Sequence, residues 1–121
     1  MTKEQALHNF WSSFDVPAYD RNTVPEDAEL PYITYEVTDG NMFEQNVITG
    51  IIWDRSTSWA NVTAIKDKVA NLIGLGGYTA NYDNGLMWIK RATPFAQRLA
   101  GEEDGIREIV INVEIEYESE V

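Results

Sequence analysis

Carboxylates are the most frequent reactive side chains in this sequence of 121 residues, which has 20 acids against 9 bases and a formal net charge of −11. They gather at Glu26-Asp27, at Glu102-Glu103-Asp104, and at Glu114, Glu116 and Glu118. Two carboxyls can act as general acid and base only where a cleft removes at least one of them from water. These acids fall in turn-like segments or at alternate positions of a strand. We therefore expect solvated carboxylates and no acid–base catalysis.

Other reactive groups are scarce. His8 is the single histidine and there is no cysteine, so a common zinc site cannot be built, and we expect an ordinary surface histidine. The glycines from Gly74 to Gly77 resemble part of a phosphate loop. A phosphate loop follows a strand and opens a helix, whereas these glycines end a helical pattern. The sequence thus predicts no enzyme, no cofactor and no metal.

Composition narrows the class of protein. A hydrophobic fraction of 44% predicts a folded chain, and its length suits a single domain over residues 1–121. No apolar stretch approaches the ~20 residues of a transmembrane helix, and the N-terminus lacks the apolar segment of a signal peptide. The absence of cysteine fits a reducing compartment. A strongly acidic surface repels phosphates, so we expect no sequence-specific nucleic-acid binding. Without a transmembrane stretch we also expect no membrane partner.

The clearest structural pattern lies near the C-terminus. Apolar side chains occupy every second position from Ile109 to Tyr117, and polar side chains fall between them: Asn112, Glu114, Glu116 and Glu118. Strict alternation predicts a half-buried strand, because successive side chains point to opposite faces. One face would join the core and the other would carry the carboxylates.

The N-terminal third predicts one helix and one long loop. Thr2 and Gln5 have the spacing of a capping box, and an apolar stripe from Leu7 to Phe14 follows. We expect a helix over residues 3–13. Residues 15–31 contain three prolines and an acidic cluster, which predicts an irregular loop.

Two strands should form a hairpin over residues 32–38 and 47–54, with the tip between Asp39 and Gln45. Met42 and Phe43 would be apolar residues exposed at this tip, so we expect them at an interface. The second strand is apolar on both faces, and helices on one side of a sheet can cover only one of them. We assign Ile48 and Ile52 to the uncovered face, where a partner would bury them.

The rest of the chain completes an α+β domain with a core over residues 32–118. A helical stripe runs from Val62 to Ile73, residues 86–91 read as a short strand, and residues 93–99 are ambiguous because of Pro94. We predict a mostly antiparallel sheet of about four to five strands, with two helices packed on one face. Trp53 and Trp88 are assigned either to packing or to a subunit interface, where tryptophan is enriched.

The order of these elements resembles that of the tail-terminator and tail-to-head joining proteins of long-tailed bacteriophages. The resemblance covers nearly the whole chain and rests on two weak motifs, the strand Leu30-Pro-Tyr-Ile-Thr-Tyr-Glu-Val37 and the ending Glu-Ile-Glu-Tyr-Glu118. It implies a virion protein without catalytic residues that closes as a ring, often hexameric, on the tail tube. Its partners would be its own copies, the tail tube protein and a head–neck connector protein, and it would assemble in the host cytoplasm. Glu114, Glu116 and Glu118 would then face a DNA channel and repel the genome.

Two alternatives stay open. The chain could be another neck, minor tail or head-completion protein. It could also be a monomeric α+β module that binds a small molecule in a pocket lined by Tyr32, Tyr35, Trp53 and Trp88.

Overall fold

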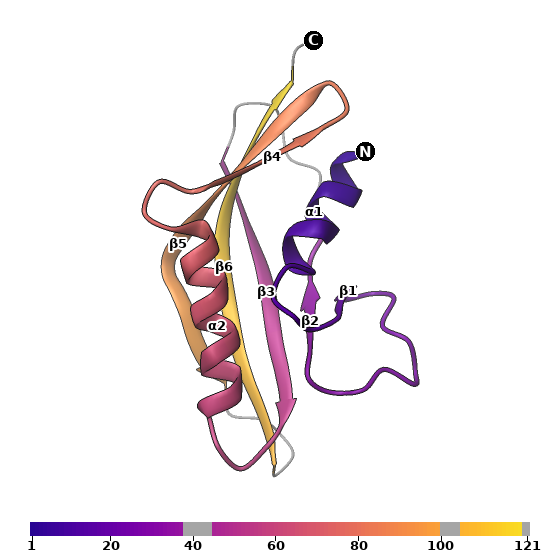
Figure 1. The fold of residues 1–121 in the computed structure, drawn as a ribbon, viewed down its shortest axis with the longest axis vertical. Helices are drawn as coiled ribbons and strands as arrows, with labels where there is room; N and C mark the ends of the chain where they lie inside the picture. The colour runs from indigo at the N-terminus through magenta and orange to yellow at the C-terminus, as the bar shows by residue number, and fades with distance from the viewer. Residues whose placement is uncertain (38–44, 100–104, 120–121) are drawn as a thin grey trace.

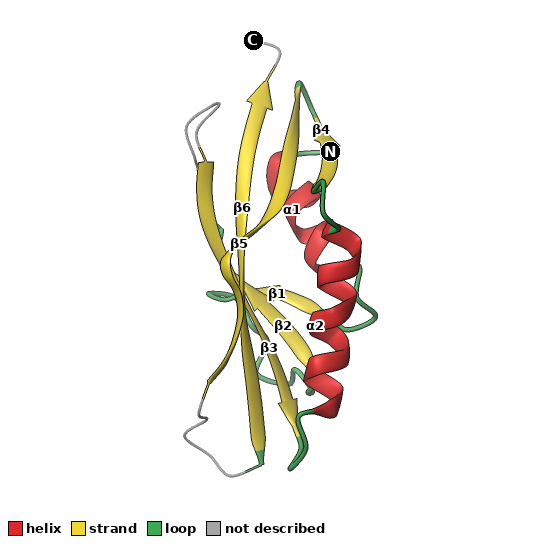
Figure 2. Cartoon of the chain, turned by 90° about the vertical axis from the view of Figure 1, so that its left-hand side faces the viewer, coloured by secondary structure: helices red, strands yellow, loops and turns green. Residues whose placement is uncertain are grey.

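The computed structural model describes residues 1–37, 45–99 and 105–119, which form two helices and one six-stranded sheet (Figure 1). The sheet has the order β1-β2-β3-β6-β5-β4 and is curled, and both helices cover the same face of it (Figure 2). In chain order the elements are α1 (Lys3–Trp11), β1 (Ala18–Asp20), β2 (Tyr32–Tyr35), β3 (Gln45–Arg55), α2 (Ala60–Ile73), β4 (Tyr78–Tyr82), β5 (Gly85–Leu99) and β6 (Ile106–Ser119).

The α+β class and the mostly antiparallel sheet are confirmed, but the sheet is larger than the sequence predicted. Four neighbouring pairs run antiparallel, whereas β1 runs parallel to β2. The two strands that were not predicted, β1 and β4, are the edge strands. β1 lies within the segment expected to be irregular, and its three residues are too few to display a period.

The boundaries of the other elements shift by a few residues. α1 ends at Trp11, two residues early, and the first strand of the expected hairpin ends at Tyr35. The ambiguous segment 93–99 continues β5, and its pairing with β6 changes register between Arg91 and Ala96. Pro94 lies in this bulge, where a residue without an N–H costs no ladder hydrogen bond.

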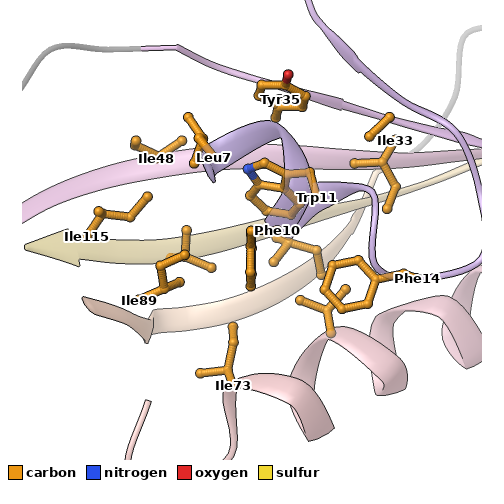
Figure 3. Close-up of a cluster of buried hydrophobic side chains, with 14 of the residues drawn as sticks. Leu7, Phe10, Trp11, Phe14, Ile33, Tyr35, Ile48, Ile73, Ile89 and Ile115 are labelled. Atoms are coloured by element: carbon orange, nitrogen blue, oxygen red, sulfur yellow. The ribbon is translucent and has the colours of Figure 1, made fainter. Parts of the chain in front are cut away.

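The core lies between α1, α2 and the covered face of the sheet. The capping box of α1 is present, with the Thr2 hydroxyl accepting from the Gln5 N–H at 3.1 Å. All four members of its apolar stripe are buried (Figure 3). Trp11 stacks on Tyr35, with ring planes 9° apart, and its ring lies against Gly50 of β3.

α2 ends as its sequence predicts, but its N-cap is Trp59, which makes no side-chain capping bond. Ser58 Oγ accepts a hydrogen bond from the Ala60 N–H at 3.1 Å. Gly74 ends the helix with a φ of +63°, a conformation that favours glycine. The predicted stripe packs on β3, β5 and β6 through Val62, Ile65, Val69 and Ile73. Leu72, also expected in the stripe, instead has 38% of its surface exposed.

One prediction about β3 is wrong. Ile48 and Ile52 are fully buried beneath the helices and belong to the core, so they do not lie on the uncovered face (Figure 3 labels Ile48). The uncovered face of β3 carries the odd-numbered residues instead, among them Val47, which is 60% exposed. β3 is apolar on both faces, so its odd-numbered and its even-numbered residues would each suit a core. Alternation alone therefore cannot reveal which face the helices cover.

Candidate assembly surface

The face of the sheet opposite the helices, called here the outer face, is not covered by either described helix (Figure 2). Cross-strand pairing places its residues in rows. Val47 of β3 lies opposite Glu114 of β6, and Trp53 lies opposite Glu108. On the other side of β6, Lys90 of β5 also lies opposite Glu114. The outer face therefore carries apolar, aromatic and charged side chains together.

Glu114, Glu116 and Glu118 form a row along the outer face of β6, called here the acidic stripe. Their neighbours Ile115 and Tyr117 point into the core, so the alternation predicted for this strand is confirmed. Each of the three glutamates is half-buried by its cross-strand neighbours. Trp88 lies opposite Glu116. The stripe thus presents three carboxylates in one direction; that it lines a DNA channel stays a prediction.

A hollow of about 340 Å³, called here the aromatic hollow, opens at the β2–β3 end of the outer face. Apolar atoms come from Val24, Tyr32, Ile51 and Trp53, and the ring centroids of Tyr32 and Trp53 lie 6.5 Å apart. Trp53 Nε1 donates to Thr34 Oγ1 at 2.9 Å, which fixes the indole in the wall. The sequence alone could not find this hollow, because the loop before β2 contributes one side of it.

An ion pair lies at the margin of the aromatic hollow. Arg21 and Glu36 both line it, and Arg21 Nη1 lies 3.0 Å from Glu36 Oε1. Both side chains are partly open to water, so the pair adds little stability and instead gives the margin a polar character. Thr34 and Thr49 also line the hollow, so its lining combines apolar and polar groups.

Trp88 occupies the other end of the outer face. Met87 and Ile89 beside it in β5 are fully buried, so Trp88 points to the opposite face of the sheet. Its Nε1 donates to the Gly76 carbonyl oxygen at 3.0 Å, and the Lys90 ammonium lies 4.3 Å from the centre of its ring. Trp88 does not line the aromatic hollow, so the expected pocket combining it with Tyr32, Tyr35 and Trp53 does not form.

Two exposed leucines at the end of α2 were missed by reasoning from the sequence. Leu75 is fully exposed in the connection between α2 and β4, and Leu72 is partly exposed in the last turn of α2. We call these two residues the leucine knob. The signal was present in the sequence as a leucine flanked by glycines, Gly74-Leu75-Gly76, which offers that leucine few neighbours.

The side chain of His8 is exposed, but both of its ring nitrogens lie close to hydroxyl groups of other residues. Its Nδ1 lies 2.9 Å from the Tyr35 hydroxyl oxygen and its Nε2 lies 3.2 Å from Ser12 Oγ. Burial raises the pKa of Tyr35, and the nearby charges of Asp20 and Glu4 raise it further. His8 therefore links α1 to β2 through Tyr35.

Two of the predicted interface residues, Met42 and Phe43, lie outside the described residues, as does the expected hairpin tip. Within the described ranges, no group of three or more His, Asp or Glu side chains is arranged to hold a metal ion. None of the helices in this part of the chain is long and apolar enough to span a membrane.

Comparison with known proteins gives one informative result. No family model and no curated protein matches the chain. Among solved structures, a chain of the "Virion of native gene transfer agent (GTA) particle" superposes with a TM-score of 0.63. The match covers 98% of this chain and 96% of that chain, at 15% sequence identity. The protein therefore shares, over its whole length, the fold of a chain found in a virion.

Proposed function

We propose that this protein is a virion structural protein, and within that class a tail terminator. It would cap the tail tube, stop its polymerisation and present the surface that joins the head. It would act by shape and by interface contacts, without catalysis or a cofactor. The observation that carries the proposal is the fold shared with a chain of a gene transfer agent virion across 98% of this chain.

The two faces of the sheet suit a ring of such subunits, hexameric in the tail. The helices cover one face, so the part of the outer face along β6 is free to line a lumen (Figure 2). With the acidic stripe directed into that lumen, Glu114, Glu116 and Glu118 would repel the phosphates of passing DNA and keep it mobile. One rim of the ring would contact the tail tube protein and the other a head–neck connector protein. The site of assembly would be the host cytoplasm, and the final location the tail or neck of the virion.

Electron microscopy of particles made without this protein tests the proposal. A tail terminator predicts full heads and tails that fail to join, or tails of unregulated length, when the gene is deleted from a phage that carries it. Tails of normal length beside leaking heads would favour a head-completion or other neck protein instead. Normal particles in normal yield would end the virion proposal altogether.

A monomeric small-molecule module is the second candidate, and the aromatic hollow favours it. Its volume of about 340 Å³ lies at the lower end of the ~300–1,000 Å³ typical of ligand pockets. Native mass spectrometry of protein purified gently from cells separates the two candidates. A stoichiometric bound small molecule that is lost on Trp53→Ala would support the module, because Trp53 forms part of the wall.

A further inference from the structure

The aromatic hollow and the leucine knob lie at opposite edges of the sheet. β1 and β2 form one edge, and β4 and β5 form the other. The hollow lies at the β2–β3 end, and the knob lies in the last turn of α2 and in the connection to β4. In Figure 1 the loop before β2 projects to the right of the molecule, and the loop after α2 projects to the left. A subunit can therefore present the two features to two different neighbours.

The two features match in chemistry. The knob offers a fully exposed leucine, Leu75, with the partly exposed Leu72. The hollow has an apolar wall from Val24, Ile51 and Trp53. If a neighbouring copy covers these exposed leucines, burial of their apolar surface stabilises the contact by about 25 cal/mol for each Å². An exposed apolar side chain at one edge and a hollow with an apolar wall at the other can form a contact between two copies.

Charge is also divided between the same two edges. From Asp15 to Val37, the segment that contains β1 and β2, the chain has six acids and a single base, Arg21. From Val69 to Leu99, the segment that contains β4 and β5, it has three bases and a single acid, Asp83. Lys68 is not counted with this edge, because it lies in α2 and pairs with Asp15 of the same copy. Because the whole chain has a net charge of −11, both edges would be expected to carry a net negative charge, and the basic excess at the β4–β5 edge is therefore unexpected. Copies should therefore attract each other when unlike edges meet and repel each other when like edges meet.

We propose that the leucine knob of one copy docks in the aromatic hollow of the next copy. Such a contact is heterologous, because each copy uses a different surface toward each neighbour. Repetition of a heterologous contact gives a closed ring when the rotation closes. The inference deepens the proposed ring function and rests on it for its biological meaning, but the contact itself can be tested on the isolated protein.

Disulfide trapping tests the contact directly, because the chain contains no cysteine that could interfere. Leu75→Cys and Val24→Cys are made as separate proteins, mixed and oxidised. The contact predicts a covalent dimer that contains one copy of each variant and exceeds each variant's self-linked dimer. Trapping reports specific contacts, since the disulfide forms only when the two Cα atoms approach to about 4.4–6.8 Å. Because the bond is covalent, linked dimers also accumulate from weak association. The double variant, which carries both cysteines, should give linked chains or closed rings.

The matched control replaces the partly exposed Leu99 with cysteine and mixes it with Leu75→Cys. The mixed dimer from the knob and the hollow should form at least tenfold faster than this control, and 1 M salt should slow it, because edge charges guide the encounter. An equal rate in the control, or a preference of Leu75→Cys for itself, would overturn the proposal. If trapping succeeds while gene deletion leaves particles normal, the contact stands and the virion function falls. If trapping fails while deletion leaves heads and tails unjoined, the function stands and this contact falls.

Discussion

The indole of Trp11 lies against the bare backbone of Gly50, so a side chain on α1 fills the space that a β-carbon on a central strand would need. A Cβ built on Gly50 would lie 2.6 Å from Trp11 Cη2 and 2.7 Å from Cζ3. Trp11 and Gly50 are both buried, and the Trp11 ring also stacks on Tyr35, which lies opposite Gly50 on the adjacent strand β2. The position of α1 on the sheet therefore depends on a glycine in β3.

Replacing Gly50 with alanine should destabilise the protein by about 1–3 kcal/mol, because the added methyl group overfills a packed core. Urea unfolding monitored by tryptophan fluorescence measures the change. Gly76→Ala is the matched control, since a Cβ at Gly76 meets no atom within 4 Å and should change the stability little. Equal stability of Gly50→Ala and Gly76→Ala would show that the Trp11 ring does not fill the space beside Gly50.

Ile48 and Val47 are neighbours in β3 with opposite exposure, and lysine at each should have opposite effects. Ile48→Lys should prevent folding, because an unpaired buried charge costs several kcal/mol. Val47→Lys should fold normally, since Val47 is exposed and its cross-strand partner is Glu114, a favourable opposite charge. Circular dichroism of the two purified variants decides the face of β3. A folded Ile48→Lys would restore the original assignment of this residue to the uncovered face.

Val69 and Lys68 give the same comparison on α2. Val69 is fully buried, so Val69→Asp should unfold the domain, whose total stability is expected to be ~5–15 kcal/mol. Lys68 pairs with Asp15 at 3.0 Å on the surface, so Lys68→Ala should cost no more than about 1 kcal/mol. Thermal unfolding of both proteins checks the helix register, and a stable Val69→Asp protein would contradict it.

The acidic stripe can be reversed without disturbing the core. Replacing Glu114, Glu116 and Glu118 together by lysine should leave the fold largely intact, because all three lie on the outer face. The variant should gain an affinity for DNA that falls steeply with salt, as phosphate contacts do. Fluorescence anisotropy with a labelled duplex measures this gain.

The matching triple glutamine variant controls for loss of negative charge alone. In a phage assay the lysine variant should block passage of the genome, whereas the glutamine variant should retain part of it. If the lysine variant gives infectious particles in normal yield, the acidic stripe does not line the DNA channel.

Stability should decline at high pH because of Tyr35. Its pKa is raised in the folded protein by burial and by the charges of Asp20 and Glu4, whereas in the unfolded chain it titrates near its ordinary value of about 10. Above that value the unfolded state loses its proton first, so the folded state loses relative stability as the pH rises toward the folded pKa. Denaturant titrations between pH 8 and pH 11 should show this decline, and Tyr35→Phe should reduce it. An unchanged decline in Tyr35→Phe would assign it to other groups.

The sequence by itself determined the local features of this protein. The capping box at Thr2, the alternation around Glu114 and Glu116, and the glycine end of α2 are all set by neighbours within a few residues. Period and capping act over one or two turns, so they can be read without knowledge of the fold. The α+β class and the mostly antiparallel pairing followed from the order of these elements.

Only the tertiary structure decided which faces and edges are available. The burial of Ile48 depends on the side of the sheet to which α1 and α2 pack, and either side suited the pattern of β3. β1 exists because β2 supplies its hydrogen bonds, and the aromatic hollow exists because a loop folds beside Trp53. Leu75 and Val24 come to opposite edges because the last strand, β6, enters the middle of the sheet between β3 and β5. That insertion depends on pairing of β3 with β6 between residues 51 to 71 positions apart, which no local pattern encodes.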